Sequence, residues 1–94
     1  MTQIIVTAVL KSKEGYEEQL LAELKKVQKG STEEAGCIQY TIHQSIEDQT
    51  FVLYEIWKDL QAVEIHNETV HYQEYRKNTA DLVAAKTVYR LKEL

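Results

Sequence analysis

Residues 50–57 read Thr-Phe-Val-Leu-Tyr-Glu-Ile-Trp, and this stretch carries the strongest strand signal in the chain. β-Branched and aromatic side chains fit the pleated surface of a sheet, so their density here favours a strand. Residues 37–44 (CIQYTIHQ) alternate between apolar and polar side chains, and a polar turn (SIEDQT) leads from them into TFVLYEIW. Two strands joined in this way predict an antiparallel β-hairpin.

A strand and a helix are expected before the hairpin. Residues 3–10 (QIIVTAVL) are β-branched and apolar, which is typical of a strand. Between residues 16 and 30, apolar residues recur at spacings of three and four, which predicts a helix with one core-facing stripe. The stripe consists of Tyr16, Leu20, Leu21, Leu24 and Val27. Gly30 is the expected end of this helix.

A helical region and a last strand are expected after the hairpin. Asp59 is a suitable N-cap for LQAVEIHN. Asn67 either interrupts that helix or caps a second one, ETVHYQEYRKN, and residues 82–91 (LVAAKTVYRL) form the last strand. The order β-α-β-β-α-β predicts a ferredoxin-like α+β fold, with a four-stranded antiparallel sheet in a single domain over residues 1–94.

The composition excludes several functional classes. The 94 residues include 11 basic and 15 acidic side chains, for a net charge of −4, which argues against nucleic acid and anionic membrane as partners. Cys37 is the single cysteine, and the three glycines form no phosphate-binding loop. The N-terminal apolar run is too short to span a bilayer and lacks the features of a secretory leader, so we expect a cytoplasmic protein.

Both faces of the expected sheet are apolar. Helices cover one face in this fold, so the other face of a monomer should be polar. A large exposed apolar face marks an interface or a ligand groove, and we therefore predict a homodimer with its sheets packed face to face. A terminal segment folded over the free face is the alternative. The strand at residues 50–57 illustrates the pattern, with Phe51, Leu53 and Trp57 on one side and Val52, Tyr54 and Ile56 on the other.

Three polar residues stand out as candidates for chemistry. Glu55 shares a strand face with apolar residues, so it is either paired structurally or functional. His66 and His71 are five residues apart, which separates their directions by about 140° on a continuous helix. A break at Asn67 would bring them closer. We see no third ligand at metal spacing and expect no metal site.

Aromatic residues are concentrated around these candidates. Tyr40 lies on the first hairpin strand, Trp57 ends the second, and Tyr72 and Tyr75 lie one helical turn apart beside His71. Aromatic side chains pack cores first. A cavity lined by tyrosine and tryptophan with one histidine also suits a flat aromatic ligand.

The stretch from Tyr40 to Tyr75 resembles the antibiotic biosynthesis monooxygenase domain family. The matching pattern is a strand ending E-x-W, then an alanine, a histidine nine residues after the tryptophan and a second histidine five residues later. In this chain these residues are Glu55, Trp57, Ala62, His66 and His71. The resemblance implies a dimeric ferredoxin-like α/β barrel with a pocket in each subunit, between sheet and helices.

The resemblance also implies an activity: cofactor-independent monooxygenation of a small aromatic or quinol-type substrate by dioxygen. Such a protein supplies a base, a dry pocket and hydrogen bonds to the substrate anion. By its place in the pattern His66 would be the base, and Glu55 would orient a histidine or a bound water. His71 would be a second polar contact. The expected pocket lining is Trp57, Tyr72, Tyr40 and Tyr75, with no metal and no bound cofactor.

Three other functions stay open. One is a non-catalytic dimeric module that binds a small molecule. Another is an isomerase of a small phosphorylated signal molecule, for which Arg76 and Lys77 are the clustered basic candidates. The third is the haem-degrading branch of the family, which needs an asparagine on the first strand and a histidine late in the second helix. Thr7 or a neighbour, and Tyr75 with Arg76, stand at those places, which disfavours haem degradation.

Overall fold

The computed structural model describes residues 2–94, so of the expected domain over residues 1–94 only Met1 lies outside it. The expected ferredoxin-like α+β fold is confirmed, with the second helical region divided into two helices. No helix of the described part of the chain has the length and hydrophobicity needed to cross a membrane. The elements, in chain order, are β1 (Ile4–Ser12), α1 (Glu17–Thr32), β2 (Cys37–Gln44), β3 (Thr50–Trp57), α2 (Leu60–Asn67), α3 (Val70–Thr79) and β4 (Val83–Leu91).

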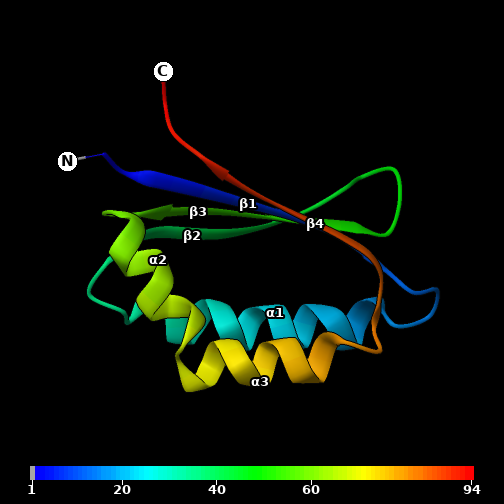
Figure 1. Cartoon of the computed structure of the whole chain (residues 1–94). Coiled ribbons are helices and arrows are strands. Elements are labelled where there is room, and N and C mark those ends of the chain that lie inside the picture. The colour runs from blue at the N-terminus through cyan, green and yellow to red at the C-terminus, as the bar shows by residue number, and fades with distance from the viewer. Residues whose placement is uncertain (1) are drawn as a thin grey trace.

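The four strands form one antiparallel sheet in the order β2-β3-β1-β4. The three helices lie on one side of this sheet, and its other side is bare (Figure 1). Because side chains alternate across a strand, every second residue of β3 points toward the helices. Phe51, Leu53, Glu55 and Trp57 are all buried on that inner face.

Helix α1 covers the sheet with the apolar stripe that its spacing predicts. Leu20, Leu24 and Val27 are buried, whereas Tyr16 precedes the helix and is 44% exposed, so its assignment to the stripe was wrong. The helix also continues past Gly30, which corrects the expected end. A Cβ atom at Gly30 would lie 2.5 Å from Cγ of His71, so the glycine permits close packing of α3 on α1.

The second helical region breaks after Asn67, as the sequence suggested. The side chain of Asp59 caps α2 by accepting a hydrogen bond from the amide of Ala62 at 2.8 Å. Thr69, rather than Asn67, caps α3, and its hydroxyl accepts a hydrogen bond from the amide of Tyr72. The same hydroxyl donates to the carbonyl of His66 at 2.7 Å, which ties the end of α2 to the start of α3.

The outer face of the sheet carries many apolar side chains, and none of the helices covers it. Direct cross-strand partners share a face. Pairing of Thr7 with Tyr54 and Tyr89, and of Ile5 with Ile56 and Leu91, therefore places these residues on the side away from the helices. Tyr89 is 53% and Leu91 43% exposed. The helices of this chain therefore bury only the inner face of the sheet.

Candidate functional site

A cavity of about 80 Å³ lies between the inner face of the sheet and helices α2 and α3. It is well below the roughly 300–1,000 Å³ of pockets for drug-sized ligands, so its size suits a single-ring molecule. Its floor is apolar and its polar groups come from two walls, one made by the helices and one by the strands. The lining residues are Val6, Ala8, Tyr40, Leu53, Glu55, Val63, His66, Asn67, Tyr72, Tyr75, Lys86, Val88 and Arg90.

His66 is the main polar group of the helix wall. It lies on the last turn of α2 and is 3% exposed, with its ring packed against Trp57 at 4.4 Å and Tyr72 at 4.8 Å between centroids. Burial lowers the pKa of His66, and the nearby Glu34 opposes this shift. The imidazole is therefore held largely neutral near pH 7, which is the form that can accept a proton.

Glu34, in the connection between α1 and β2, joins both predicted histidines. Its Oε2 atom lies 2.6 Å from Nδ1 of His66 and 2.8 Å from Nε2 of His71. The side chain of Glu34 is only 12% exposed, and backbone bonds to Ser31 and Cys37 fix its position. No sequence pattern marked Glu34, because it lies 32 residues from His66 in a loop.

Glu55 is the main polar group of the strand wall. It is 5% exposed, and its Oε1 accepts a hydrogen bond from Nε1 of Trp57 at 3.0 Å. Burial raises the pKa of Glu55 to about 7, the indole N–H and Lys86 oppose the rise, and Glu34 adds to it. A substantial fraction of this carboxyl is therefore protonated at neutral pH, which makes it a candidate proton donor.

Three tyrosines complete the aromatic lining. Tyr40 and Tyr75 are buried, and Tyr72 stacks at a tilt between Tyr75 and His66. Burial raises the pKa of each of these phenols, and Glu55 raises each further. The tyrosines therefore stay protonated at neutral pH and can donate hydrogen bonds to a bound anion.

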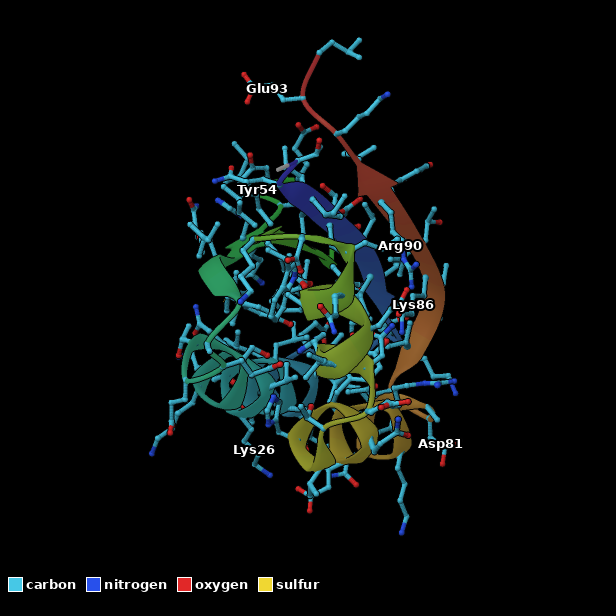
Figure 2. All side chains as sticks on the ribbon, turned by 60° about the vertical axis from the view of Figure 1, so that its left-hand side comes forward. Lys26, Tyr54, Asp81, Lys86, Arg90 and Glu93 are labelled. Atoms are coloured by element: carbon cyan, nitrogen blue, oxygen red, sulfur yellow. The ribbon has the colours of Figure 1, made fainter. Side chains whose placement is uncertain are left out.

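Two cations of β4 border the cavity, and the sequence analysis missed both. Lys86 pairs across the sheet with Leu10 and Arg90 with Val6, which places them on the inner face. Both residues lie along β4 (Figure 2). The Nζ atom of Lys86 lies 5.4 Å from the centre of the Tyr75 ring. Of the pair expected from sequence, neither Arg76 nor Lys77 is in this lining, and Arg76 borders a neighbouring hollow with Lys86.

The same region holds the one group of three potential metal ligands among residues 2–94: Glu34, His66 and His71. We had expected no metal because the sequence showed no third ligand, and that premise was wrong, since Glu34 is a potential third ligand. Ligands bound at about 2.1 Å and at right angles stay roughly 3 Å apart. The His66–Glu34 contact of 2.6 Å is shorter and has the length of a hydrogen bond. In this structure the two histidines are hydrogen-bonded to Glu34, and binding of a metal would require the side chains to move apart.

Two residues that were expected to contact the substrate, Trp57 and His71, lie outside the cavity wall. Trp57 is fully buried behind Glu55 and His66, so it supports the site without bordering the cavity. His71 contacts Glu34 and is not among the residues that line the cavity. The carboxylate that contacts the histidines is Glu34, so Glu55 does not orient a histidine here, and its expected contact with a bound water stays a prediction. His66, Glu55, Tyr40, Tyr72 and Tyr75 do border the cavity.

Known proteins are similar to this chain in fold and in sequence. Residues 3–78 match the antibiotic biosynthesis monooxygenase family. A Bacillus subtilis protein named "Putative monooxygenase YcnE" is 35% identical over 83 residues, covering 87% of each chain. The crystal structure of PA3566 from Pseudomonas aeruginosa has 30% identity and a TM-score of 0.94, with 100% of this chain and 96% of that one covered. A Nitrosomonas europaea structure named "Putative antibiotic biosynthesis monooxygenase" has 26% identity and a TM-score of 0.94, covering 99% and 91%. The family match spans most of the chain, which therefore belongs to the antibiotic biosynthesis monooxygenase family.

Proposed function

We propose that this protein is a cofactor-independent monooxygenase that oxidises a small aromatic or quinol-type substrate with dioxygen. The observation that carries the proposal is the state of His66. Its Nδ1 is engaged by Glu34, whereas its Nε2 has no hydrogen-bond partner among residues 2–94 and is not among the fully buried unpartnered atoms. A neutral imidazole bordering a largely aromatic and apolar cavity suits a general base.

The chemistry balances without an external reductant. His66 takes the proton of a substrate hydroxyl, the O–H electron pair stays on the substrate, and the resulting anion is electron-rich enough to reduce dioxygen. One oxygen atom forms a new carbon–oxygen bond, and the other leaves as water with two hydrogens that the substrate supplies. The substrate thus provides every electron and becomes a quinone. Dioxygen and the substrate are the two small-molecule partners, and no bound cofactor is required.

Glu55 has a complementary role in this proposal. It borders the same cavity as His66, and its pKa of about 7 leaves part of the population protonated. A protonated Glu55 donates a proton to the oxygen that leaves as water, and the proton that His66 took from the substrate restores Glu55, so the net supply of both hydrogens is the substrate. Tyr40, Tyr72 and Tyr75 supply flat apolar contact and phenolic donors for the substrate anion.

Oxygen consumption with a panel of single-ring quinols, without added cofactor, tests the proposal. His66→Ala should lower kcat by roughly 10²–10⁴-fold, which is the usual contribution of a general base. Glu64→Ala is the matched control, since Glu64 is exposed on the same helix α2 and does not border the cavity. Unchanged turnover in His66→Ala would remove His66 from the mechanism, and a panel without any oxygen uptake would favour a non-catalytic binding module.

The proposed unit of function is a cytoplasmic homodimer of single-domain chains. The uncovered apolar face, which includes Ile5, Tyr54, Ile56 and Tyr89, supports packing of two sheets against each other. Introducing a charge with Tyr54→Lys should shift the mass measured by light scattering from dimer to monomer. A monomeric wild-type protein at micromolar concentration would contradict the assembly.

A second candidate function is isomerisation of a small phosphorylated signal molecule, and Lys86 and Arg90 favour it. Neither cation forms an ion pair within residues 2–94, and both border the cavity. Cations placed in this way suit an anionic substrate group. Competition by inorganic phosphate for ligand binding, lost in an Arg90→Gln variant, would support this candidate over a neutral quinol.

A further inference from the structure

Glu34 is a nearly buried carboxylate to which the proposed chemistry gives no direct part. Both of its strong contacts are to imidazole nitrogens, and both converge on the single atom Oε2. The other oxygen, Oε1, is fully buried without a donor among residues 2–94. Among the described residues, the two imidazoles are therefore the only side-chain donors that compensate this carboxylate for lost hydration.

This arrangement determines where the proton of a neutral His66 resides. A carboxylate oxygen only accepts hydrogen bonds, so a ring nitrogen 2.6 Å away must carry a hydrogen. His66 then holds its proton on Nδ1, and the lone pair is on Nε2. The opposite tautomer would set two lone pairs against each other in a buried site and would leave no base at Nε2.

We propose that Glu34 is a positioning residue that fixes the base-competent tautomer of His66 and stabilises the imidazolium formed when Nε2 takes the substrate proton. His71 completes the unit by holding Glu34 from the other side. This inference rests on the proposed role of His66 as base. The logic is that of a carboxylate that orients a catalytic histidine through the ring nitrogen opposite the one that takes the proton.

His71 can hold Glu34 because of two features of the fold. The break after Asn67 redirects the chain, so residues five apart on consecutive helices reach one carboxylate, with ring centroids 6.0 Å apart. Gly30 lets the His71 ring lie directly against α1. His71 is 28% exposed at its side chain, so it forms the outer end of the unit, while His66 forms the buried end.

The groups that surround this unit set its electrostatics. His66 lies near the tyrosine rings and Trp57, and His71 disfavours charge on it, whereas Glu34 favours that charge. Glu55 is the other acidic group of the site, and Glu34 raises its pKa. Removing the charge of Glu34 should therefore weaken His66 as a base and lower the pKa of Glu55 together.

The decisive experiment combines ¹⁵N NMR of the histidine rings with steady-state kinetics of the full-length protein. In the wild type we expect His66 in the Nδ1–H form. Glu34→Leu should shift His66 toward the Nε2–H form and lower kcat by about 10²-fold, with KM changed less than threefold. Glu33→Leu, one residue away and exposed, is the matched control and should behave as wild type.

A conservative variant separates orientation from charge. Glu34→Gln keeps an acceptor oxygen but loses the charge, so it should retain more Nδ1–H tautomer than Glu34→Leu and show an intermediate kcat. His71→Ala should lower kcat by about tenfold or less, because it loosens Glu34 without removing it. If His66 keeps its Nδ1–H form in Glu34→Leu, or if kcat is unchanged there, the positioning role is wrong.

Two further outcomes keep the inference distinct from the proposed function. If no quinol is oxidised, the proposed activity fails, and the tautomer measurement alone then decides whether Glu34 orients His66. Calorimetric titration with Zn²⁺ should give no stoichiometric binding to the wild type. Tight one-to-one zinc binding that is abolished by Glu34→Leu would overturn the inference, because the three side chains would then be metal ligands.

Discussion

Each wall of the cavity buries one ionisable side chain, and the two walls differ in where the residue that contacts this side chain lies in the sequence. On the helix wall, His66 is supported by Glu34, a residue far away in sequence that reaches it from a loop. On the strand wall, Glu55 is supported by Trp57, two residues along the same strand. Burial lowers the pKa of the histidine and raises that of the carboxyl, so each is pushed toward its neutral form. A neutral base and a neutral acid in one cavity are what proton transfer requires.

The largest effect should come from removing the support of the strand wall. Trp57→Ala deletes a fully buried indole that packs on His66 and bonds Glu55. We expect the free energy of unfolding to fall by about 3–5 kcal/mol in chemical denaturation. Ile46→Ala, in the exposed hairpin turn, should stay within about 0.5 kcal/mol of wild type. An equal decrease in the free energy of unfolding in both variants would show that Trp57 does not support the site as described.

The pH dependence of stability isolates Glu55. Folding raises its pKa from 4.5 to about 7, so this group stabilises the fold fully below pH 4.5 and that stabilisation is lost as the pH rises through about 7. Glu55→Gln removes the dependence and keeps an acceptor for Trp57. From pH 5 to pH 8 its stability relative to wild type should therefore increase, by up to roughly 3 kcal/mol. Parallel stability curves for the two proteins would refute the shifted pKa.

The pH dependence of turnover compares both walls at once. His66 must be neutral, so kcat/KM should rise with pH through a value below 6.5, the ordinary pKa of histidine. Glu55 must be protonated, so the rate should fall again near pH 7, about tenfold per pH unit at higher pH. The alkaline limb should disappear in Glu55→Gln and persist in Glu74→Gln, where the changed residue is exposed on α3. A retained limb in Glu55→Gln would assign it to another group.

The smallest effect concerns the cations of the strand wall. Lys86→Gln should raise KM for carboxylate-bearing quinols by about fivefold, which corresponds to about 1 kcal/mol, with neutral quinols affected less. Lys92→Gln, beyond the end of β4, is the charge-matched control and should change neither. Equal effects on charged and neutral quinols would show that Lys86 does not contact the substrate anion.

Local patterns in the sequence predicted most of the fold but only part of the site. Strand alternation identified the face that Glu55 shares with Leu53 and Trp57, and the Asp59 cap and the break at Asn67 were also anticipated. These features depend on neighbours in sequence, which periodicity records.

The missed features depend on contacts between distant segments. Glu34 lies in a loop, and nothing nearby indicates that its partner is His66, 32 residues later. Gly30 was taken as a helix end because its actual role, close packing against His71, involves another helix. Lys86 and Arg90 point to the same side of β4, whose residues are mostly exposed. Because no buried apolar residues mark one face of this strand, its pattern did not show which side chains point toward the helices.

The position of β4 at the edge of the sheet has a consequence for access to the cavity. This strand bonds to β1 alone, and nearly all of its residues are exposed, yet it forms one side of the cavity. Edge segments with few buried contacts open at lower free energy than central strands. Amide hydrogens of β4 should therefore exchange with deuterium sooner than those of β1 and β3, so the side of the cavity that β4 forms is the part of the sheet that opens most readily.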